Sequence, residues 1–393
     1  MSATEETGPG GCAKQSLARR LREKIKEAGT ITFRDWMESA LYEPVEGYYR
    51  RNDRNRWGRE GDYRTSPERS PLFAATFARY FATLYENLNR PSRWTIVEMG
   101  AGSGHFAEGV LSTLRSRFPN VFAATNYVID EISESSVAAA RERLQPFNDH
   151  VEFVPLAEIP TIEKGLVFSN ELLDAFPVHR VTMRDGHLGE YYVAVDEAGG
   201  FQWTIGPPST VRLAEYLDFV GVRIGEGQIV EINLGIESWL RNIAQRLVNG
   251  YVVTVDYGAE ASELSGAEAS EPHRTGEHRL GTLRAFCRHQ LVDDVLAAPG
   301  EQDLTTTIDW SFVKKVGERL GLETLEFERQ DRFLLKAGLL EELEVSVTFS
   351  KTEAERVTLR TSAREMILPD GMAASFQVLV QKKSMESGRV PES

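Results

Sequence analysis

From Trp94 onward, short apolar runs alternate with a helical pattern. The runs are WTIVEM, NYVIDE, VEFVP, GLVFSNE and GYVVTVDYG, and a helix is predicted from about His105 to Phe118. Each run has the length and continuous apolar character of a buried strand. Strands that alternate with helices predict a parallel sheet, whose ligands bind beyond the carboxyl ends of the strands. ETLEFERQ and ASFQVLVQKK are predicted to be the last two strands.

Other segments follow different patterns. Residues 178–205, VHRVTMRDGHLGEYYVAVDEAGGFQWTI, alternate apolar and polar positions around DG and GG turns, which predicts an inserted antiparallel region. Leu17, Leu21 and Ile25 recur every four residues, which predicts an amphipathic helix ending near Gly29. A second helix is expected in TITFRDWMESAL. EASELSGAEASEPHRTGEH is predicted to be a loop, and GTLRAFCRHQ the helix after it.

These elements predict an α/β fold with a Rossmann-like, seven-stranded and mostly parallel sheet. An N-terminal helical cap and an inserted antiparallel, substrate-binding region complete it. The expected parts are a disordered N-terminus at 1–13, the cap with a cofactor-closing loop at 14–92, the cofactor-binding half of the core at 93–177, the insertion at 178–235, the rest of the core at 236–384 with a long loop at 259–310, and a disordered tail at 385–393.

The charge of the chain narrows its partners. Its 393 residues carry 45 basic and 59 acidic side chains, a formal net charge of -14. This balance argues against a nucleic-acid partner, because nonspecific duplex binding needs a basic surface. No apolar run approaches the roughly 20 residues that span a bilayer. No membrane span is therefore expected, and the sequence leaves the oligomeric state open.

The cysteines, the histidines and the first residues argue against a disulfide, a metal site and a mitochondrial presequence. Cys12 and Cys287 lie far apart, and His273, His278 and His289 match no metal-site spacing, so neither a disulfide nor a metal is expected. The start, MSATEETGPGGCAKQS, has no basic region before an apolar run, and it carries acids that a mitochondrial presequence avoids. The expected location is therefore the cytoplasm.

The segment VEMGAGSGHF, residues 97–106, is the first candidate for chemistry. A dinucleotide fingerprint has glycine at its first, third and sixth positions. Gly100 and Gly102 fit the first two, but His105 occupies the sixth, and Glu98 would place a carboxylate where a pyrophosphate should bind. S-adenosylmethionine, with its ammonium and sulfonium, fits better. Gly100, Gly102 and Gly104 would then let the backbone approach this cofactor closely. The alternative is a tight turn without a ligand.

The next predicted strand ends in two acids, Asp130 and Glu131. A carboxylate at this position accepts hydrogen bonds from ribose hydroxyls in nucleotide-binding sheets. Glu131 is the preferred ribose ligand and Asp130 its rival. Either acid could instead be a solvated strand end.

GLVFSNELLDAFPV supplies a second polar cluster. If a helical turn follows the strand, Glu171 and Asp174 lie three residues apart on one face, at the cofactor end of the sheet. Methyl transfer from a sulfonium chiefly requires a positioned nucleophile. A guanidinium stays protonated, and carboxylates that grip it can localise its charge on one nitrogen and orient another. Asn170, Glu171 and Asp174 are therefore predicted at the reaction centre. The alternative is that these acids only favour a helix dipole.

Several motifs, in order from Ala40 to about Leu339, together resemble the MidA-like class I methyltransferases. The motifs are ALYEPVEGYY, GDYRTSPERSPLF, VEMGAGSG, DEIS, SNELLDAFPV, VDYG, GTLRAFCRH and APGEQDLTTTIDW. This family includes a mitochondrial protein arginine methyltransferase needed to assemble respiratory complex I. The resemblance implies the class I methyltransferase fold and S-adenosylmethionine as cofactor. It also implies an arginine on a respiratory-chain subunit as methyl acceptor, giving symmetric dimethylarginine.

The resemblance also implies roles for other residues. The segment expected to close over the cofactor carries Gly61, Asp62, Thr65, Pro67 and Glu68. The expected substrate-binding residues are Asp256, Tyr257 and His289. Further residues agree with the family's motifs but have no assigned role: Gly258, Thr282, Arg284, Pro299, Gly300, Asp303, Thr305 and Asp309. The chain departs from the family at Thr307, where relatives commonly have histidine, and at Tyr63 and Ser66, where Phe and Ala are usual.

The sequence thus predicts an S-adenosylmethionine-dependent methyltransferase that acts on an arginine of a protein client. Three alternatives remain. A noncatalytic assembly factor could retain the fold and the cofactor site. A small-molecule methyltransferase would share the same residues. A nicotinamide-dependent oxidoreductase is the third, and His105 and Glu98 argue against it.

Overall fold

The largest sheet of the molecule contains the predicted apolar strands. The computed structural model describes residues 16–51, 70–264, 281–287, 290–368 and 375–384. The strands of this central sheet are β2 Trp94–Met99, β3 Thr125–Asp130, β4 Val151–Phe153, β5 Ile162–Asn170, β10 Leu247–Ala259, β15 Leu322–Arg329 and β16 Phe376–Lys383. Their order is β15-β16-β10-β5-β2-β3-β4, and a short strand, β14 Ile308–Asp309, adds to β10.

All pairs from β10 to β4 are parallel, whereas β16 runs antiparallel to both β10 and β15. The predicted seven-stranded, mostly parallel sheet is therefore confirmed. β2, β5 and β10 end at the same edge, so the residues that follow them in sequence meet there.

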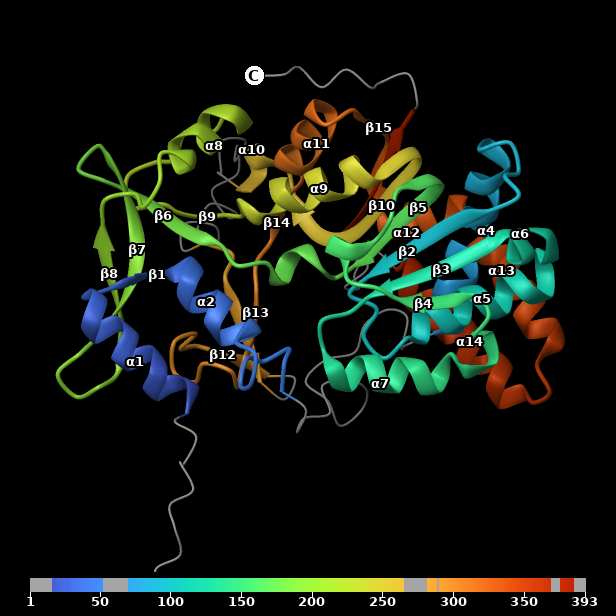
Figure 1. The fold of residues 1–393 in the computed structure, drawn as a ribbon, viewed down its shortest axis with the longest axis horizontal. Coiled ribbons are helices and arrows are strands. Elements are labelled where there is room, and N and C mark those ends of the chain that lie inside the picture. Colours follow the sequence, from blue (N-terminus) through green and yellow to red (C-terminus); the bar gives the residue numbers. More distant parts are fainter. Residues whose placement is uncertain (1–15, 52–69, 265–280, 288–289, 369–374, 385–393) are drawn as a thin grey trace, which may run out of the picture.

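Helices cover both faces of the central sheet (Figure 1). One layer contains α4 Pro71–Asn87, α5 His105–Arg117, α12 Gln330–Lys336 and α14 Glu353–Ile367, and the other α8 Arg212–Val220, α9 Gly235–Arg246 and α11 Trp310–Arg319. Phe106 of α5 stacks on Phe168 of β5 with ring centroids 4.3 Å apart. Because both faces of β5 and β10 are covered, the middle of each strand is a buried apolar run, Leu166–Phe168 in β5 and Tyr251–Val253 in β10.

Further helices pack beside these layers. α6 Pro119–Ala124, α7 Glu134–Arg143 and α13 Leu339–Phe349 pack with the layer of α4 and α5, and α10 Ala261–Leu264 packs with α11. 3₁₀ turns lie at Gln145–Phe147, Leu156–Glu158 and Leu173–Ala175.

The inserted region forms a second, antiparallel sheet. It contains β1 Ile31–Thr32, β6 His179–Arg184, β7 His187–Val195, β8 Phe201–Gly206 and β9 Ile229–Ile232. Asp185 and Gly186 join β6 to β7 with φ values of 52° and 75°. Such a turn matches the twist of a hairpin and favours the Asp-Gly pair that predicted it.

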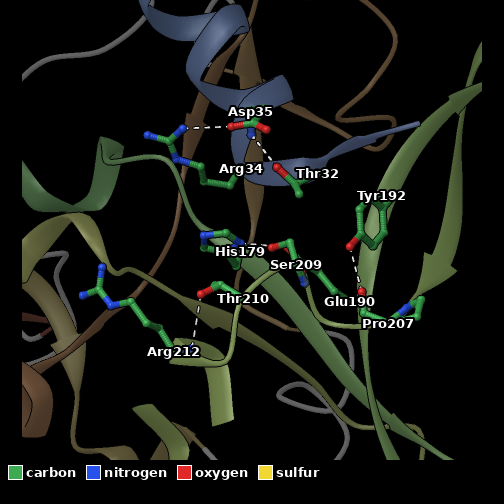
Figure 2. A network of polar contacts seen from close by, with 10 residues as sticks. All are labelled: Thr32, Arg34, Asp35, His179, Glu190, Tyr192, Pro207, Ser209, Thr210 and Arg212. Atoms are coloured by element: carbon green, nitrogen blue, oxygen red, sulfur yellow. Dashed lines mark hydrogen bonds and ion pairs between the residues drawn. The ribbon is translucent and has the colours of Figure 1, made fainter. Parts of the chain in front are cut away.

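A polar network anchors this sheet to the segment before α8 (Figure 2). Oε1 of the buried Glu190 lies 2.7 Å from Nδ1 of His179, and its Oε2 accepts a hydrogen bond from the backbone of Ser209 at 2.6 Å. The Tyr192 hydroxyl donates to the carbonyl of Pro207. Burial alone would raise the pKa of the Glu190 carboxyl, but the hydrogen bonds from His179 and Ser209 hold this pKa below its usual value. The network thus fixes where α8 begins.

The two predicted N-terminal helices are confirmed, and they pack on the second sheet. α1, Leu17–Ala28, buries the predicted stripe, and α2, Phe33–Tyr42, begins after a side-chain cap from Thr32. The ring centroids of Phe33 and of Trp203 on β8 are 5.0 Å apart. Both helices lie with the second sheet at the left of Figure 1, whereas α4, expected in the cap at 14–92, packs in the central layer.

The prediction of a helix at GTLRAFCRHQ is wrong. β11 Arg284–Cys287, β12 Gln290–Val292 and β13 Asp303–Thr305 form a small antiparallel sheet. β11 pairs with a strand on each edge, and Ala285 is buried against the same cluster as Leu304. β12 follows β11 closely in sequence, whereas β13 is about 20 residues away, so strand pairing rather than local helical propensity decides the conformation. The expected long loop at 259–310 therefore contains a sheet.

Candidate functional site

The glycine turn joins β2 to α5 through three left-handed residues. Gly100, Gly102 and Gly104 have φ values of 70°, 54° and 79°. Residues with a side chain avoid this region, so the backbone itself requires glycine here. A Cβ on Gly104 would also lie 3.0 Å from that of Ala140 on α7. The turn therefore brings α5 close to α7 and exposes backbone at the end of β2.

Glu131 lies beside this turn. Its two carboxylate oxygens accept hydrogen bonds from the backbone N–H groups of Gly102 and Ser133, both at 2.8 Å. Asp130 instead accepts a hydrogen bond from the backbone of Leu156, while burial raises the pKa of its carboxyl. Of the two acids that compete for the ribose role, Glu131 is the one in contact with the glycine turn.

Glu98 is buried beneath the turn, with 4% of its surface exposed. Tyr127 donates a hydrogen bond to its Oε2 at 2.7 Å. Burial raises the pKa of the Glu98 carboxyl to about 8; the charge of Glu131 acts in the same direction, against the Tyr127 hydrogen bond. The carboxyl is therefore mostly neutral at pH 7. A neutral carboxyl repels no pyrophosphate, so the charge argument against a dinucleotide is wrong. The argument that still holds is His105, which occupies the sixth position of the fingerprint, where a dinucleotide site has glycine.

A second turn follows β5, and it is not the predicted helical turn. Glu171 has a φ of 52°, in the left-handed region, and the 3₁₀ turn begins only at Leu173. Glu171 and Asp174 therefore do not share one helical face. The cause is Asp256, whose Oδ2 accepts backbone hydrogen bonds from Leu172, Leu173 and Asp174 at 3.2, 2.9 and 3.3 Å.

This arrangement also gives Asp256 a role different from the predicted one. Its side chain is fully buried, and its Oδ1 accepts a further backbone hydrogen bond from Tyr257. Burial raises the pKa of the carboxyl, and the charge of Asp174 raises it further. A carboxyl enclosed by backbone donors cannot contact a client side chain. The structure thus contradicts the predicted substrate contact of Asp256 and makes it the anchor of the turn.

Asp174 is the carboxylate that the turn presents. Its Oδ2 accepts hydrogen bonds from the hydroxyls of Tyr257 at 2.6 Å and Thr305 at 2.7 Å. Within the described part of the chain, its Oδ1 is buried and has no hydrogen-bond partner. The same holds for Oδ1 of Asn170, whose amide donates to Glu171 at 3.1 Å. Buried acceptors are normally satisfied, so these two atoms fit donors supplied by a ligand.

The two turns form one site. A Cβ on Gly100 would lie 3.0 Å from Cδ1 of Leu172, so the glycine turn and the acidic turn pack directly against each other. The charged groups on and beside the two turns include the carboxyls of Glu131, Glu171 and Asp174, while Arg143 of α7 donates to the carbonyl of Ser103 in the glycine turn at 2.9 Å. These carboxyl and amide acceptors suit a ligand with positive charge, as S-adenosylmethionine and a guanidinium both have.

An aromatic segment at 40–51 closes one side of the site. The Tyr42 hydroxyl donates to the carbonyl of Ala175 at 2.9 Å, and Arg50 donates to the carbonyl of Ile132 at 2.9 Å. The rings of Tyr42 and Tyr49 stack with centroids 5.5 Å apart. We did not predict these residues as part of the site. The signal was present in the aromatic density of ALYEPVEGYY, but only the folded chain brings it to the acidic turn.

The other residues singled out in the sequence make different contacts or lie outside the described residues. The backbone N–H of Thr307, at the position of the family histidine, donates to the hydroxyl of Thr282 at 3.1 Å. The predicted cofactor-closing residues (Gly61, Asp62, Thr65, Pro67 and Glu68) and the three histidines (His273, His278 and His289) fall outside the described residues.

The chain matches known proteins over most of its length. The profile of the Methyltransf_28 family, described as S-adenosyl-L-methionine-dependent methyltransferases, matches residues 76–328. A crystal structure of a COG1565 superfamily protein from Burkholderia thailandensis, bound to S-adenosyl-homocysteine, is 28% identical. It has a TM-score of 0.82 and covers 93% of this chain and 92% of its own. A native structure of a COG1565 protein from the same organism has a TM-score of 0.78 at 28% identity, covering 94% and 93%.

Curated relatives carry a common name. "Protein arginine methyltransferase NDUFAF7 homolog, mitochondrial" of Drosophila melanogaster is 27% identical over 81% of this chain and 73% of its own. The human "Protein arginine methyltransferase NDUFAF7, mitochondrial" is 24% identical over 95% and 85%. Because these relatives are named as mitochondrial proteins, the predicted cytoplasmic location is wrong.

No helix within the described ranges is long and apolar enough to cross a membrane. The glycine turn, the acidic turn and the sheet that joins them agree with the profile match and with the fold shared with a structure that holds S-adenosyl-homocysteine. The chain therefore belongs to the MidA-like family of class I S-adenosylmethionine-dependent methyltransferases.

Proposed function

We propose that this methyltransferase methylates an arginine side chain of a protein client. The observation that supports this most is Asp174, a carboxylate with 8% exposure. Two hydroxyls hold its Oδ2, and its Oδ1 has no partner within the described residues. A buried acceptor beside a cofactor turn suits a charged donor better than a neutral one, because hydrogen bonds to ionised groups are stronger.

Residues of the two turns would hold the cofactor. S-adenosylmethionine supplies a methyl group bound to a sulfonium. Glu131 would bind the ribose hydroxyls, because a carboxylate at the end of this strand accepts such hydrogen bonds in nucleotide-binding sheets. Glu98 would face the cationic methionine end, where a positive charge favours the ionised carboxyl. The left-handed glycines would permit close approach of the backbone. The segment with Gly61 and Glu68 would close over this site, as the family resemblance implies.

The acidic turn would orient the acceptor. A guanidinium carries its charge across three nitrogens, and Asp174 and Glu171 would localise that charge away from the nitrogen to be methylated. When the nitrogen takes the methyl group, the bond from sulfur to that group would break and its electron pair would stay on the sulfur as a neutral thioether. The methylated nitrogen would lose a proton, and Asp174 Oδ1 would accept it. Burial raises the pKa of the Asp174 carboxyl, although the hydroxyls of Tyr257 and Thr305 and the nearby backbone N–H groups of Asp174 and Ala175 act in the opposite direction. A raised pKa favours proton uptake.

Two further properties belong to the same proposal. The relatives from Drosophila and human are named protein arginine methyltransferases, which supports arginine as the acceptor. The family resemblance adds symmetric dimethylarginine as the product and a respiratory-chain subunit as the client.

The test is a methylation assay with isotope-labelled S-adenosylmethionine. Purified protein would be offered a library of peptides in matched pairs that differ only by arginine or lysine, and products would be located by mass spectrometry. Label on arginine alone is the expected result. Label only on lysine, or only on small molecules from a deproteinised extract, would show that the acceptor class is wrong. Cofactor binding by calorimetry without turnover on any protein would favour the noncatalytic assembly factor.

A further inference from the structure

We propose that Asp303 is a second carboxylate of the acceptor site and that it binds, together with Asp174, the positively charged side chain of the client. The inference rests on the proposed arginine methylation and adds a specificity residue to it. Asp303 lies on β13, more than 100 residues from the acidic turn in sequence.

The register of β13 directs Asp303 toward the acidic turn. Asp303 and Thr305 are two residues apart on one strand, so their side chains leave the same face. The hydroxyl of Thr305 bonds to Oδ2 of Asp174 at 2.7 Å, and the backbone N–H of Thr306 bonds to the carbonyl of Asp174 at 3.0 Å. The strand is therefore fixed against the turn at the next residue on that face. Leu304, between them, points to the opposite face and is buried.

Two stacked tyrosines connect Asp303 to the other side of the same turn. The Tyr49 hydroxyl donates to Oδ1 of Asp303 at 2.7 Å, and the Tyr49 ring stacks on that of Tyr42. Tyr42 in turn bonds to the carbonyl of Ala175, the neighbour of Asp174. Asp303 thus contacts the wall of the site through Tyr49 and shares a strand face with Thr305.

The electrostatics agree with this placement. Burial raises the pKa of the Tyr42 hydroxyl most, and then the charges of Asp174, Asp303 and Glu131 raise it further. Asp174 and Asp303 also raise the pKa of Tyr257, after burial. Both tyrosines therefore lie within the field of both carboxylates.

This geometry suits a guanidinium. Positions i and i+2 of a strand are about 6.6 Å apart, so Asp303 lies one such step along β13 from Thr305, whose hydroxyl bonds to Asp174. We infer that the carboxylates of Asp303 and Asp174 approach a planar group from two directions. Arginine has five N–H donors in a fixed fork, whereas a lysine ammonium is a compact point charge. The stacked tyrosines add aromatic surface on which a guanidinium packs favourably. A site with two carboxylates therefore favours arginine over lysine.

The experiment compares variants on the arginine peptide that gives the highest turnover in the library. Asp303→Asn should raise KM for this peptide at least tenfold, with cofactor affinity unchanged. Asp303→Glu should recover part of the loss, because it restores the charge. Tyr49→Phe removes the hydrogen bond to Asp303 but keeps the ring, and it should have a clearly smaller effect. Asp293→Asn, an exposed acid nearby on the same chain segment, controls for net charge.

Equal losses for Asp303→Asn and Tyr49→Phe would overturn the inference, because Asp303 would then only position the tyrosine. So would an unchanged KM for Asp303→Asn, or a loss of cofactor binding that matches the loss of activity. If the wild-type protein methylates no arginine peptide, the proposed function itself fails. Normal wild-type turnover with an unaffected Asp303→Asn variant contradicts this inference alone.

Discussion

The hydroxyl of Tyr257 donates a 2.6 Å hydrogen bond to Oδ2 of Asp174. Tyr257 lies near the end of β10, Asp174 follows the adjacent parallel strand β5, and the two residues are 83 positions apart in sequence. This hydrogen bond leaves Oδ1 of Asp174 for a ligand. Tyr257 comes directly after Asp256, the residue that anchors the acidic turn. The anchor of the turn and the partner of its carboxylate thus occupy consecutive positions.

Loss of the Asp174 charge should stop transfer without loss of cofactor. We expect Asp174→Asn to lower kcat for the arginine peptide by about 100-fold or more, the scale seen when a preorganised electrostatic partner is removed. Tyr257→Phe should cost less, since the carboxylate remains. Tyr192→Phe, which removes a comparable hydroxyl contact to Pro207 in the second sheet, is the matched control. Steady-state kinetics and calorimetry measure both quantities. A kcat near wild type for Asp174→Asn would contradict its assigned role.

Cofactor binding should release a proton from Glu98. The pKa of about 8 in the cofactor-free chain lies above the ordinary value of 4.5, so at pH 7 the buried carboxyl is mostly protonated. A cation placed beside it favours ionisation, and affinity should therefore rise with pH below about 7.5, where the cofactor amine stays charged. Calorimetry in buffers of different ionisation enthalpy measures the released proton. Glu98→Gln should bind more than tenfold more weakly and release none; equal proton release in both proteins would exclude Glu98 as the source.

The left-handed glycine turn should tolerate no side chain. Gly102→Val should weaken S-adenosylmethionine binding more than tenfold while the protein stays folded, because the backbone would leave its φ of 54°. Gly186→Val is the control: it has a φ of 75° in a turn of the second sheet, with open space around its Cβ position. Both variants lose comparable backbone freedom, and only the first should affect affinity. Similar affinity losses in the two would point to general destabilisation.

Asp256 should govern stability more than substrate contact. Asp256→Ala leaves three buried N–H groups of the acidic turn without their acceptor, and we expect a loss of about 2–4 kcal/mol in the free energy of unfolding. Asp256→Asn keeps one acceptor oxygen and should lose less. Urea unfolding followed by circular dichroism measures the difference. If Asp256→Ala unfolds like wild type and only peptide KM rises, the predicted substrate contact regains support.

Much of the fold could be predicted from local pattern. The apolar runs from WTIVEM to GYVVTVDYG are strands because both faces are covered by helices, and such burial leaves a continuous signal. The stripe of Leu17, Leu21 and Ile25 likewise follows directly from its period. The error at GTLRAFCRHQ shows where this stops. Its conformation depends on pairing with β12, which begins at Gln290 at the end of the segment, and with β13, which lies wholly outside the segment.

The sequence alone determined the glycine turn and the acids beside it. A left-handed backbone requires glycine, and a ribose site uses a carboxylate at a strand end, so both features can be read from residue types and their order in the sequence. The acidic turn was decided by tertiary structure. Asp256 reaches back across the sheet edge to fix it, β13 brings Thr305 and Asp303 to Asp174, and Tyr42 and Tyr49 arrive from the N-terminal segment. Such contacts join residues far apart in the chain, and only the packing of the folded sheets brings them within hydrogen-bond distance.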